Sequence, residues 1–148
     1  MFDLTGKTVL LTGATGGIGR AIAKTLHTQG ANLVLTDISE EALEKFKAEL
    51  CERVEVFAGD ITNLDNIKFL LKFSKEHFDS IDILINNAGI TKDTLSMRMT
   101  DEMWDKVLTV NLTAGFRLTR EILPQMMKKR WGRIISMASI VGVIGNLG

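Results

Sequence analysis

The 148-residue chain has one cysteine, one proline and no tyrosine, and it carries no net charge. A single cysteine, Cys51, excludes a disulfide within the chain. No apolar run approaches the roughly 18 residues that a membrane-spanning helix needs, so we expect no insertion into a membrane. The first residues, MFDL, have neither the basic nor the apolar region of an export signal. We therefore expect a cytoplasmic location.

The balance of charge also limits the class of partner. Eighteen basic and eighteen acidic residues leave no overall field that would attract nucleic acid or a polyanion. With 45% apolar and 24% charged residues, the composition is that of an ordinary globular domain. We expect one domain over residues 1–148, selective through local sites, with no nucleic-acid partner and no metal site.

Short apolar runs alternate with longer segments of helical periodicity along the whole chain. This βαβ alternation predicts parallel strands joined by right-handed crossover helices, which cover both faces of the sheet. The expected fold is a doubly wound, Rossmann-type α/β sandwich of three layers with strand order 3-2-1-4-5, whose ligand crevice lies at the carboxyl ends of the strands. The five runs are KTVLLTG (7–13), ANLVLTD (31–37), RVEVFAGD (53–60), IDILINNAG (81–89) and GRIISMAS (132–139).

Capping residues indicate where the first helices begin and end. A helix over residues 18–29 is expected to stop at Gly30. Ser39 is placed to cap the next, which runs to about residue 50. Thr62 and Asp65 have the spacing of a capping box for the third.

The fourth helix is expected after Thr100, running to about residue 128 with a kink at Pro124. Its apolar residues form two stripes, so we expect burial from more than one side. The second stripe indicates a subunit interface or a missing neighbour, and filling of the core stays open as the alternative. The stripes are Met103, Val107, Val110, Ala114 and Leu118, and Trp104, Leu108 and Leu112.

The segment TGATGGIG, residues 12–19, follows an apolar strand and opens a helix. In that context Gly13 permits a tight turn, Gly17 lets a phosphate approach the backbone, and Gly19 lets the helix pack on the strand. A diphosphate would bind the free N–H groups of the helix amino end. A turn without a ligand is the alternative. No GK[ST] follows, which argues against a nucleoside-triphosphate loop.

Asp37 ends the second predicted strand, roughly 20 residues beyond the glycines. A carboxylate there can accept hydrogen bonds from both ribose hydroxyls of an adenosine, and it would repel a 2′-phosphate. No arginine stands beside it or within the glycine turn, so these residues favour NADH over NADPH. A solvated aspartate before the helix is the alternative.

Five motifs together resemble the short-chain dehydrogenase/reductase family. They are TGATGGIG, Asp60 in GDIT, NNAG at residues 86–89, Asn111 within a helix, and Ser139 after GRIISMAS. Within that family, residues 86–112 and 126–146 look like the 3-oxoacyl-[acyl-carrier-protein] reductases, which use NADPH in type II fatty-acid synthesis. The resemblance covers the whole chain.

The resemblance implies roles for individual residues. The glycine turn would bind the diphosphate, Asp60 and Ile61 the adenine, and the NNAG loop the ribose, unless that loop is only an Asn-stabilised turn. Asn111 would be buried and hold a water that leads to the catalytic lysine. Ser139 would hydrogen-bond the substrate carbonyl during hydride transfer. The implied cofactor residues are Gly13, Thr15, Gly17, Ile18, Gly19, Asp37, Asp60, Ile61, Asn87, Ala88 and Gly89.

The implied partners are an acyl carrier protein and further copies of the chain in a homotetramer. Lys129 and Arg130 resemble the basic patch that receives the acidic carrier protein, and an ordinary cationic helix end is the alternative.

The family's catalytic tyrosine and lysine, in a YxxxK motif beyond the serine, are absent. General acid catalysis is typically worth about 10²- to 10⁴-fold, so we expect the 148 residues alone to be nearly inactive. Two interpretations stay open: the amino-terminal part of a complete oxidoreductase, cut after the fifth strand, or a nucleotide-binding remnant without catalysis. A dehydrogenase for another ketone or alcohol is a further alternative. In the first, residues 139–148 form the loop on the substrate side of the site, and we expect this loop to be mobile or disordered in the 148 residues alone.

Overall fold

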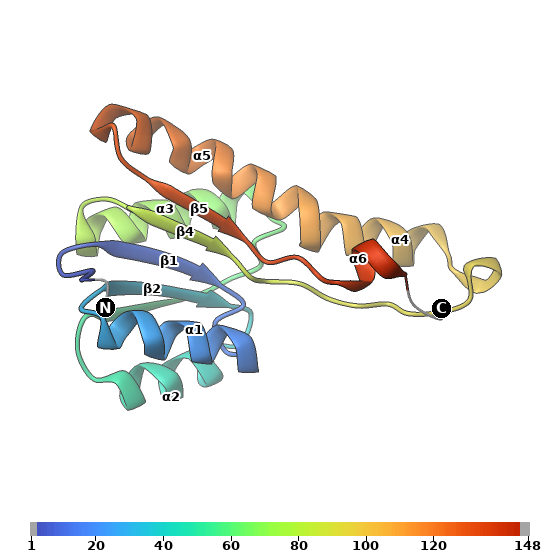
Figure 1. The fold of residues 1–148 in the computed structure, drawn as a ribbon, viewed down its shortest axis with the longest axis horizontal. Helices are drawn as coiled ribbons and strands as arrows, with labels where there is room; N and C mark the ends of the chain where they lie inside the picture. The colour runs from blue at the N-terminus through green and yellow to red at the C-terminus, as the bar shows by residue number, and fades with distance from the viewer. Residues whose placement is uncertain (1–2, 146–148) are drawn as a thin grey trace.

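A computed structural model describes residues 3–145 and has the doubly wound architecture (Figure 1). Five parallel strands form one sheet in the order β3-β2-β1-β4-β5, as the alternation predicts. Helices α1 and α2 cover one face, and α3 and α5 cover the other. The strands are β1 (Thr8–Thr12), β2 (Asn32–Asp37), β3 (Val54–Ala58), β4 (Ile83–Asn86) and β5 (Arg133–Ser136). The helices of these two layers are α1 (Gly17–Thr28), α2 (Glu40–Leu50), α3 (Leu64–Phe78) and α5 (Ala114–Lys129).

The two faces of the sheet have separate apolar cores. In β1 every residue is buried, and side chains alternate between the cores: Val9 and Leu11 pack beneath α1 and α2, while Leu10 packs beneath α3 and α5. A central parallel strand covered on both faces reads as a continuous apolar run, which is why KTVLL carries no polar alternation.

The expected long helix after Thr100 has a change of hydrogen bonding that the sequence did not indicate. It consists of α4 (Asp101–Leu108), a π-helical segment η2 (Thr109–Thr113) and α5. α5 runs on through Pro124, so the interruption lies at η2 and not at the proline. Single π turns of this kind are frequent at functional sites.

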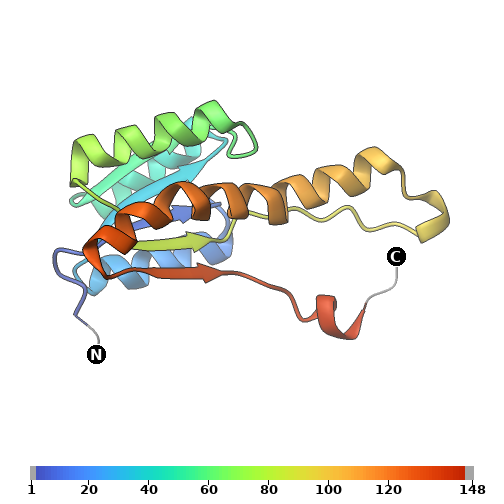
Figure 2. The same ribbon diagram turned by 90° about the horizontal axis from the view of Figure 1, so that it is seen from above.

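The two apolar stripes of this long helix have different environments. Ala114 and Leu118 are fully buried, because α5 lies on the sheet. Trp104, Leu108 and Leu112 are 55%, 38% and 65% exposed, so this stripe does not fill the core of residues 3–145, and the expected subunit interface or missing neighbour stays a prediction. Figures 1 and 2 show the reason: α4 extends beyond the end of the sheet and has no sheet beneath it.

Two of the expected helix boundaries are confirmed and one is wrong. Ser39 caps α2 by accepting from the amide of Ala42 at 3.3 Å, and Gly30 follows α1 with φ of +90°. α3 is capped by Asn63 and not by Thr62, since the Asn63 side chain accepts from the amide of Asp65 at 2.8 Å. Thr62 instead bonds to Asp60.

The chain after β5 has little regular structure, and its expected mobility stays a prediction. Residues 141–144 form a single helical turn, α6 (Val141–Ile144), and residues 146–148 lie outside the described part. Every residue from 133 to 145 is exposed, including the edge strand β5. Within residues 3–145 no helix combines the length and apolarity needed to cross a membrane.

Candidate functional site

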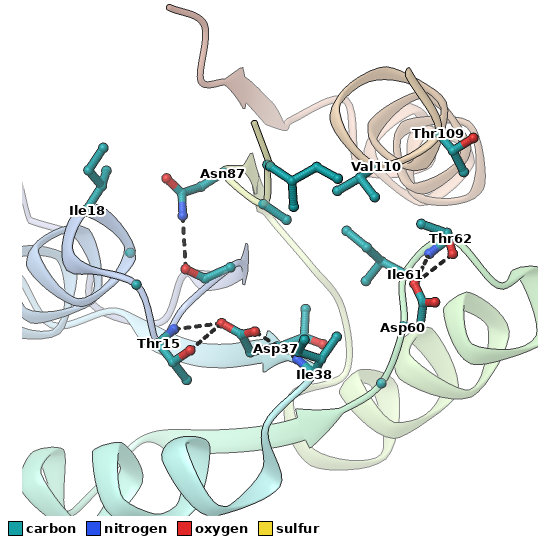
Figure 3. A pocket seen from close by; sticks show the side chains of 18 of the residues that line it. Thr15, Ile18, Asp37, Ile38, Asp60, Ile61, Thr62, Asn87, Thr109 and Val110 are labelled. Carbon is teal, nitrogen blue, oxygen red and sulfur yellow. Dashed lines mark hydrogen bonds between the residues drawn. The ribbon is translucent and has the colours of Figure 1, made fainter. Parts of the chain in front are cut away.

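A cleft of about 820 Å³ opens at the carboxyl ends of the strands, where the fold predicts a ligand (Figure 3). Its volume lies within the range of about 300–1,000 Å³ that small-molecule sites have. Segments that follow β1, β2, β3 and β4 form it, together with the end of α4 and the start of η2. The lining residues are Gly13, Thr15–Gly19 (15–19), Thr36–Ile38 (36–38), Gly59–Thr62 (59–62), Asn87–Ile90 (87–90), Asp105, Lys106, Thr109 and Val110.

The three glycines of the turn differ in what a side chain at each position would contact. Gly13 has φ of +63°, and a Cβ there would lie 2.8 Å from the Cα of Ala88. At Gly19 a Cβ would overlap the carbonyl oxygen of Gly13. Around Gly17 a Cβ would meet nothing within 4 Å. Gly13 and Gly19 therefore serve close packing of the chain itself, while Gly17 faces open space.

The amino end of α1, at this turn, is left without a capping side chain. Gly16 is the N-cap, no side chain accepts from the first amides, and the first turn has no acidic residue. By contrast, α2, α3 and α4 begin with the capping side chains of Ser39, Asn63 and Thr100, and each has an acidic residue in its first turn. Free N–H groups and the positive end of a helix dipole form a site for an anion.

Asp37 lies at the end of β2 beside this turn. One carboxylate oxygen accepts from the amide and the hydroxyl of Thr15, and the other accepts from the amide of Ile38 at 2.8 Å. Figure 3 shows the carboxylate held at the floor of the cleft between these donors. The side chain has structural partners and is not merely solvated before α2.

Asp60 begins the segment that leads from β3 to α3. Its carboxylate accepts from the amide and hydroxyl of Thr62 at 2.8 and 2.7 Å, and its carbonyl accepts from the side chain of Asn66 at 3.2 Å. These bonds fix a compact turn whose residues, with Ile61, line the cleft.

The NNAG loop is bonded to the end of β1. Asn87 donates its side-chain amide to the carbonyls of Thr12 and Gly13 at 3.0 Å each, and the amides of Asn87 and Ala88 donate to the Thr12 hydroxyl. The loop therefore has the Asn-stabilised geometry considered above and also lines the cleft through Asn87, Ala88 and Gly89.

Asn111 sits in the π segment η2. Its side chain accepts from the amide of Ile90 at 2.8 Å and donates to the carbonyl of Ile90 at 2.9 Å. The residue is exposed, so the expectation of burial is wrong, although the expected hydrogen-bond partners are present. Asn111 thus joins the helix to the backbone just after the NNAG loop.

Ser139 lies beyond the carboxyl end of β5 and is exposed. Among the described residues, its hydroxyl accepts one long bond, 3.4 Å, from the amide of Val141. It belongs to the same end of the sheet as the cleft but does not line it. Figure 2 shows the chain after β5 leading away from α4.

Lys129 and Arg130 end α5 at the opposite, amino end of the strands, just before β5. The ammonium of Lys129 donates to the hydroxyl of Ser80 and lies 3.2 Å from the carboxylate of Asp82, whose side chain is 7% exposed. Lys129 therefore connects the end of α5 to the segment before β4. Arg130 is exposed and ends the helix with φ of +53°.

Three residues that shape the site are not predicted as site residues by the sequence. Thr12 organises the NNAG loop through its hydroxyl, and Thr109 and Val110 supply a wall from η2. Val110 was assigned only to an apolar stripe. Its apolar side chain in a helix is equally compatible with the core and with a cleft, so the local sequence does not show which of the two it faces.

Comparison with known proteins agrees with this geometry. The chain is 53% identical over 148 residues to nodulation protein G of Rhizobium sp. (strain N33), covering 100% of this chain. It is 44% identical over 146 residues to the 3-oxoacyl-[acyl-carrier-protein] reductase FabG of Vibrio cholerae, covering 99% of the chain. The corresponding reductase of Haemophilus influenzae is 46% identical over 145 residues, covering 98% of the chain. The chain spans 60% of the length of each of these relatives.

The family model described as "short chain dehydrogenase" matches residues 7–148. That match includes the glycine turn, the Asp60 turn, the NNAG loop, Asn111 and Ser139. The parallel sheet in the order β3-β2-β1-β4-β5 and the cleft at its carboxyl edge are in keeping with the match. The chain belongs to the short-chain dehydrogenase family.

Proposed function

We propose that the protein is an NAD(P)H-dependent reductase of 3-oxoacyl thioesters carried by an acyl carrier protein. The single observation that carries the cofactor part is the uncapped amino end of α1, which opens on the cleft without an acidic residue in its first turn. The choice of substrate is supported by the names of the Vibrio cholerae and Haemophilus influenzae relatives.

The residues of the cleft fit a dinucleotide. The amides at Gly17 and Ile18 would bind the diphosphate, Asp37 the adenosine ribose, and the turn at Asp60 the adenine. A Cβ at Gly17 would enter space that the chain itself leaves empty. When bound, the nicotinamide would supply the hydride that reduces the ketone. Because Asp37 carries a negative charge where a 2′-phosphate would come, we propose NADH as the preferred cofactor.

The chain's own residues would orient and polarise the substrate. Ser139 has a hydroxyl with no short hydrogen bond among residues 3–145, so it is free to donate to a substrate carbonyl. Such a donor stabilises the negative charge that develops on the oxygen. Asn111 would hold the backbone of Ile90, and with it the NNAG loop, in place.

We also propose that the protein forms a homotetramer and binds an acyl carrier protein. The exposed stripe of Trp104, Leu108 and Leu112 offers an apolar surface for the homotetramer. Arg130 is the exposed cation of the proposed carrier-protein patch, since Lys129 is shared with Asp82. We propose that the protein acts in the cytoplasm.

The activity is tested on a protein of the relatives' full length that contains these 148 residues, by following oxidation of NADH and NADPH in the presence of an acetoacetyl thioester. Ser139→Ala should lower kcat by about 10²-fold or more, the typical loss of a donor to a developing oxyanion. Ser96→Ala, an exposed serine in the short helix η1 (Ser96–Arg98), is the control and should leave the rate unchanged. Full activity of Ser139→Ala would refute the assignment of Ser139.

A second candidate is nucleotide binding without catalysis. It is favoured by the position of Ser139, which does not line the cleft. Under this candidate the protein binds NADH, measured by calorimetry, but no ketone accelerates its oxidation. Faster turnover of a ketone other than a 3-oxoacyl thioester would instead move the proposal to another substrate.

A further inference from the structure

The segment from β3 to α3, residues 59–63, forms one wall of the cleft and is held mainly by its own bonds. Gly59 is fixed at the start, where its amide donates to the carbonyl of Asp37 at 2.9 Å. In the middle, Asp60 accepts from Thr62 and from the amide of Asn63. These bonds define the shape of the turn, but they do not tie its far end to the rest of the cleft.

Arg117 of α5 supplies that tie. Its Nη1 donates to the carbonyl oxygen of Thr62 at 2.8 Å, across 55 positions of sequence. The contact is partly buried, and within residues 3–145 Arg117 forms no ion pair with a carboxylate. A charged donor to a single carbonyl is a stronger bond than a neutral one, so it is well suited to fix a loop.

The same helix carries the facing wall. α5 continues directly from η2, whose Thr109 and Val110 line the cleft. Figure 3 shows Val110 on the helix close to Ile61, with Thr62 beside Ile61. Because Arg117 lies seven positions, about two helical turns, after Val110 on one continuous helix, its bond fixes the spacing between the two walls.

We propose that Arg117 is a positioning residue for the adenosine half of the cofactor. The inference rests on the proposed function, since it assumes that a dinucleotide occupies the cleft with its adenine at Asp60 and Ile61. Arg117 itself does not line the cleft, so it acts through the carbonyl of Thr62. Without this bond the turn must be ordered by the ligand at each binding event, which lowers affinity.

The test measures binding of two cofactor fragments by calorimetry, ADP-ribose and reduced nicotinamide mononucleotide, with the full chain. Arg117→Met should weaken ADP-ribose by about tenfold, the loss expected for one charge-assisted hydrogen bond, and should leave the mononucleotide unchanged. Arg120→Met is the matched control. Arg120 is exposed on the same helix, and within residues 3–145 its guanidinium bonds to Glu121 and lies 5.5 Å from the ring centroid of Phe116. Its loss removes the same charge without touching the cleft.

A second readout needs no ligand. Amide hydrogen exchange at residues 60–63 should become faster in Arg117→Met than in wild type or Arg120→Met. Arg117→Lys, which retains a cation and one donor, should fold and should weaken ADP-ribose by less than about threefold.

Three results would overturn the inference. They are unchanged affinity for ADP-ribose in Arg117→Met, equal weakening of both fragments, and an effect of the same size in Arg120→Met. If Arg117→Met does not fold, Arg117→Lys decides: an unfolded or fully impaired Lys variant would make Arg117 a residue of the fold alone. Wild type that binds no ADP-ribose would refute the proposed function, and exchange at residues 60–63 would still report whether Arg117 holds the turn.

Discussion

Thr15 donates both its backbone amide and its hydroxyl to one carboxylate oxygen of Asp37, at 3.0 and 2.5 Å. The glycine turn after β1 is thereby bonded to the end of β2, the neighbouring strand. A negative charge is therefore held in a fixed place at the edge of the cleft.

This relationship predicts the cofactor preference. Asp37→Ala should raise the ratio of kcat/KM for NADPH over NADH by at least about tenfold, because a like charge beside a 2′-phosphate costs more than about 1.4 kcal/mol. Thr15→Val keeps the carboxylate and removes one donor, so the ratio should move by less than about threefold. An unchanged ratio in Asp37→Ala would remove Asp37 from the specificity argument.

The glycines of the turn should separate folding from binding. Gly17→Ala should leave the free energy of unfolding in urea equal to or slightly above that of wild type, because the added methyl meets nothing and alanine favours the helix. Its affinity for NADH should nevertheless fall by tenfold or more, about 1.4 kcal/mol.

Gly19→Ala is the contrasting variant. Its methyl would overlap the carbonyl oxygen of Gly13, so we expect a loss of about 1–3 kcal/mol in the free energy of unfolding. Equal stability of the Gly17 and Gly19 variants would contradict the different roles assigned to the two glycines.

Lys129 should contribute to stability at the other end of the sheet. Lys129→Met leaves the nearly buried carboxylate of Asp82 without its cation. Breaking a fully buried pair costs about 3–5 kcal/mol, and since the Lys129 side chain is 42% exposed we expect about 1–2 kcal/mol. Lys128→Met, at the exposed neighbouring position, should change the free energy of unfolding by less than about 0.5 kcal/mol. The same loss in both variants would argue against the pair.

Asn111 should control the order of the chain just after the NNAG loop. Asn111→Leu removes both bonds to Ile90, so the amide of Ile90 should exchange its hydrogen faster than in wild type. Because the site is exposed, the loss in the free energy of unfolding should be only about 1 kcal/mol. Asn111→Asp keeps the acceptor for the Ile90 amide and should retain part of its protection. Full protection of Ile90 in Asn111→Leu would show that other contacts hold this segment.

The difference between what sequence predicts and what it misses is clear at the start of α3. Thr62 and Asn63 are adjacent and either can cap a helix, and the Thr62–Asp65 spacing favoured the wrong one. The choice depends on Asp60, which engages the Thr62 hydroxyl and so leaves Asn63 to cap α3. The long helix is similar: its apolar stripes predict helix, but they do not indicate the π segment, where Asn111 bonds to Ile90, 21 positions earlier.

The sequence by itself determined the strand order, the glycine turn, the acidic residue at the end of β2 and the family, because periodicity, backbone freedom and motif spacing are local properties of the chain. Only the tertiary structure decided that Thr15 donates to Asp37, that Lys129 pairs with Asp82, and that Arg117 of α5 donates to the carbonyl of Thr62. These contacts join residues between 22 and 55 positions apart. They exist because the crossover connections bring segments from separate strands and helices together at either end of the sheet, and no local pattern encodes which side chains then meet.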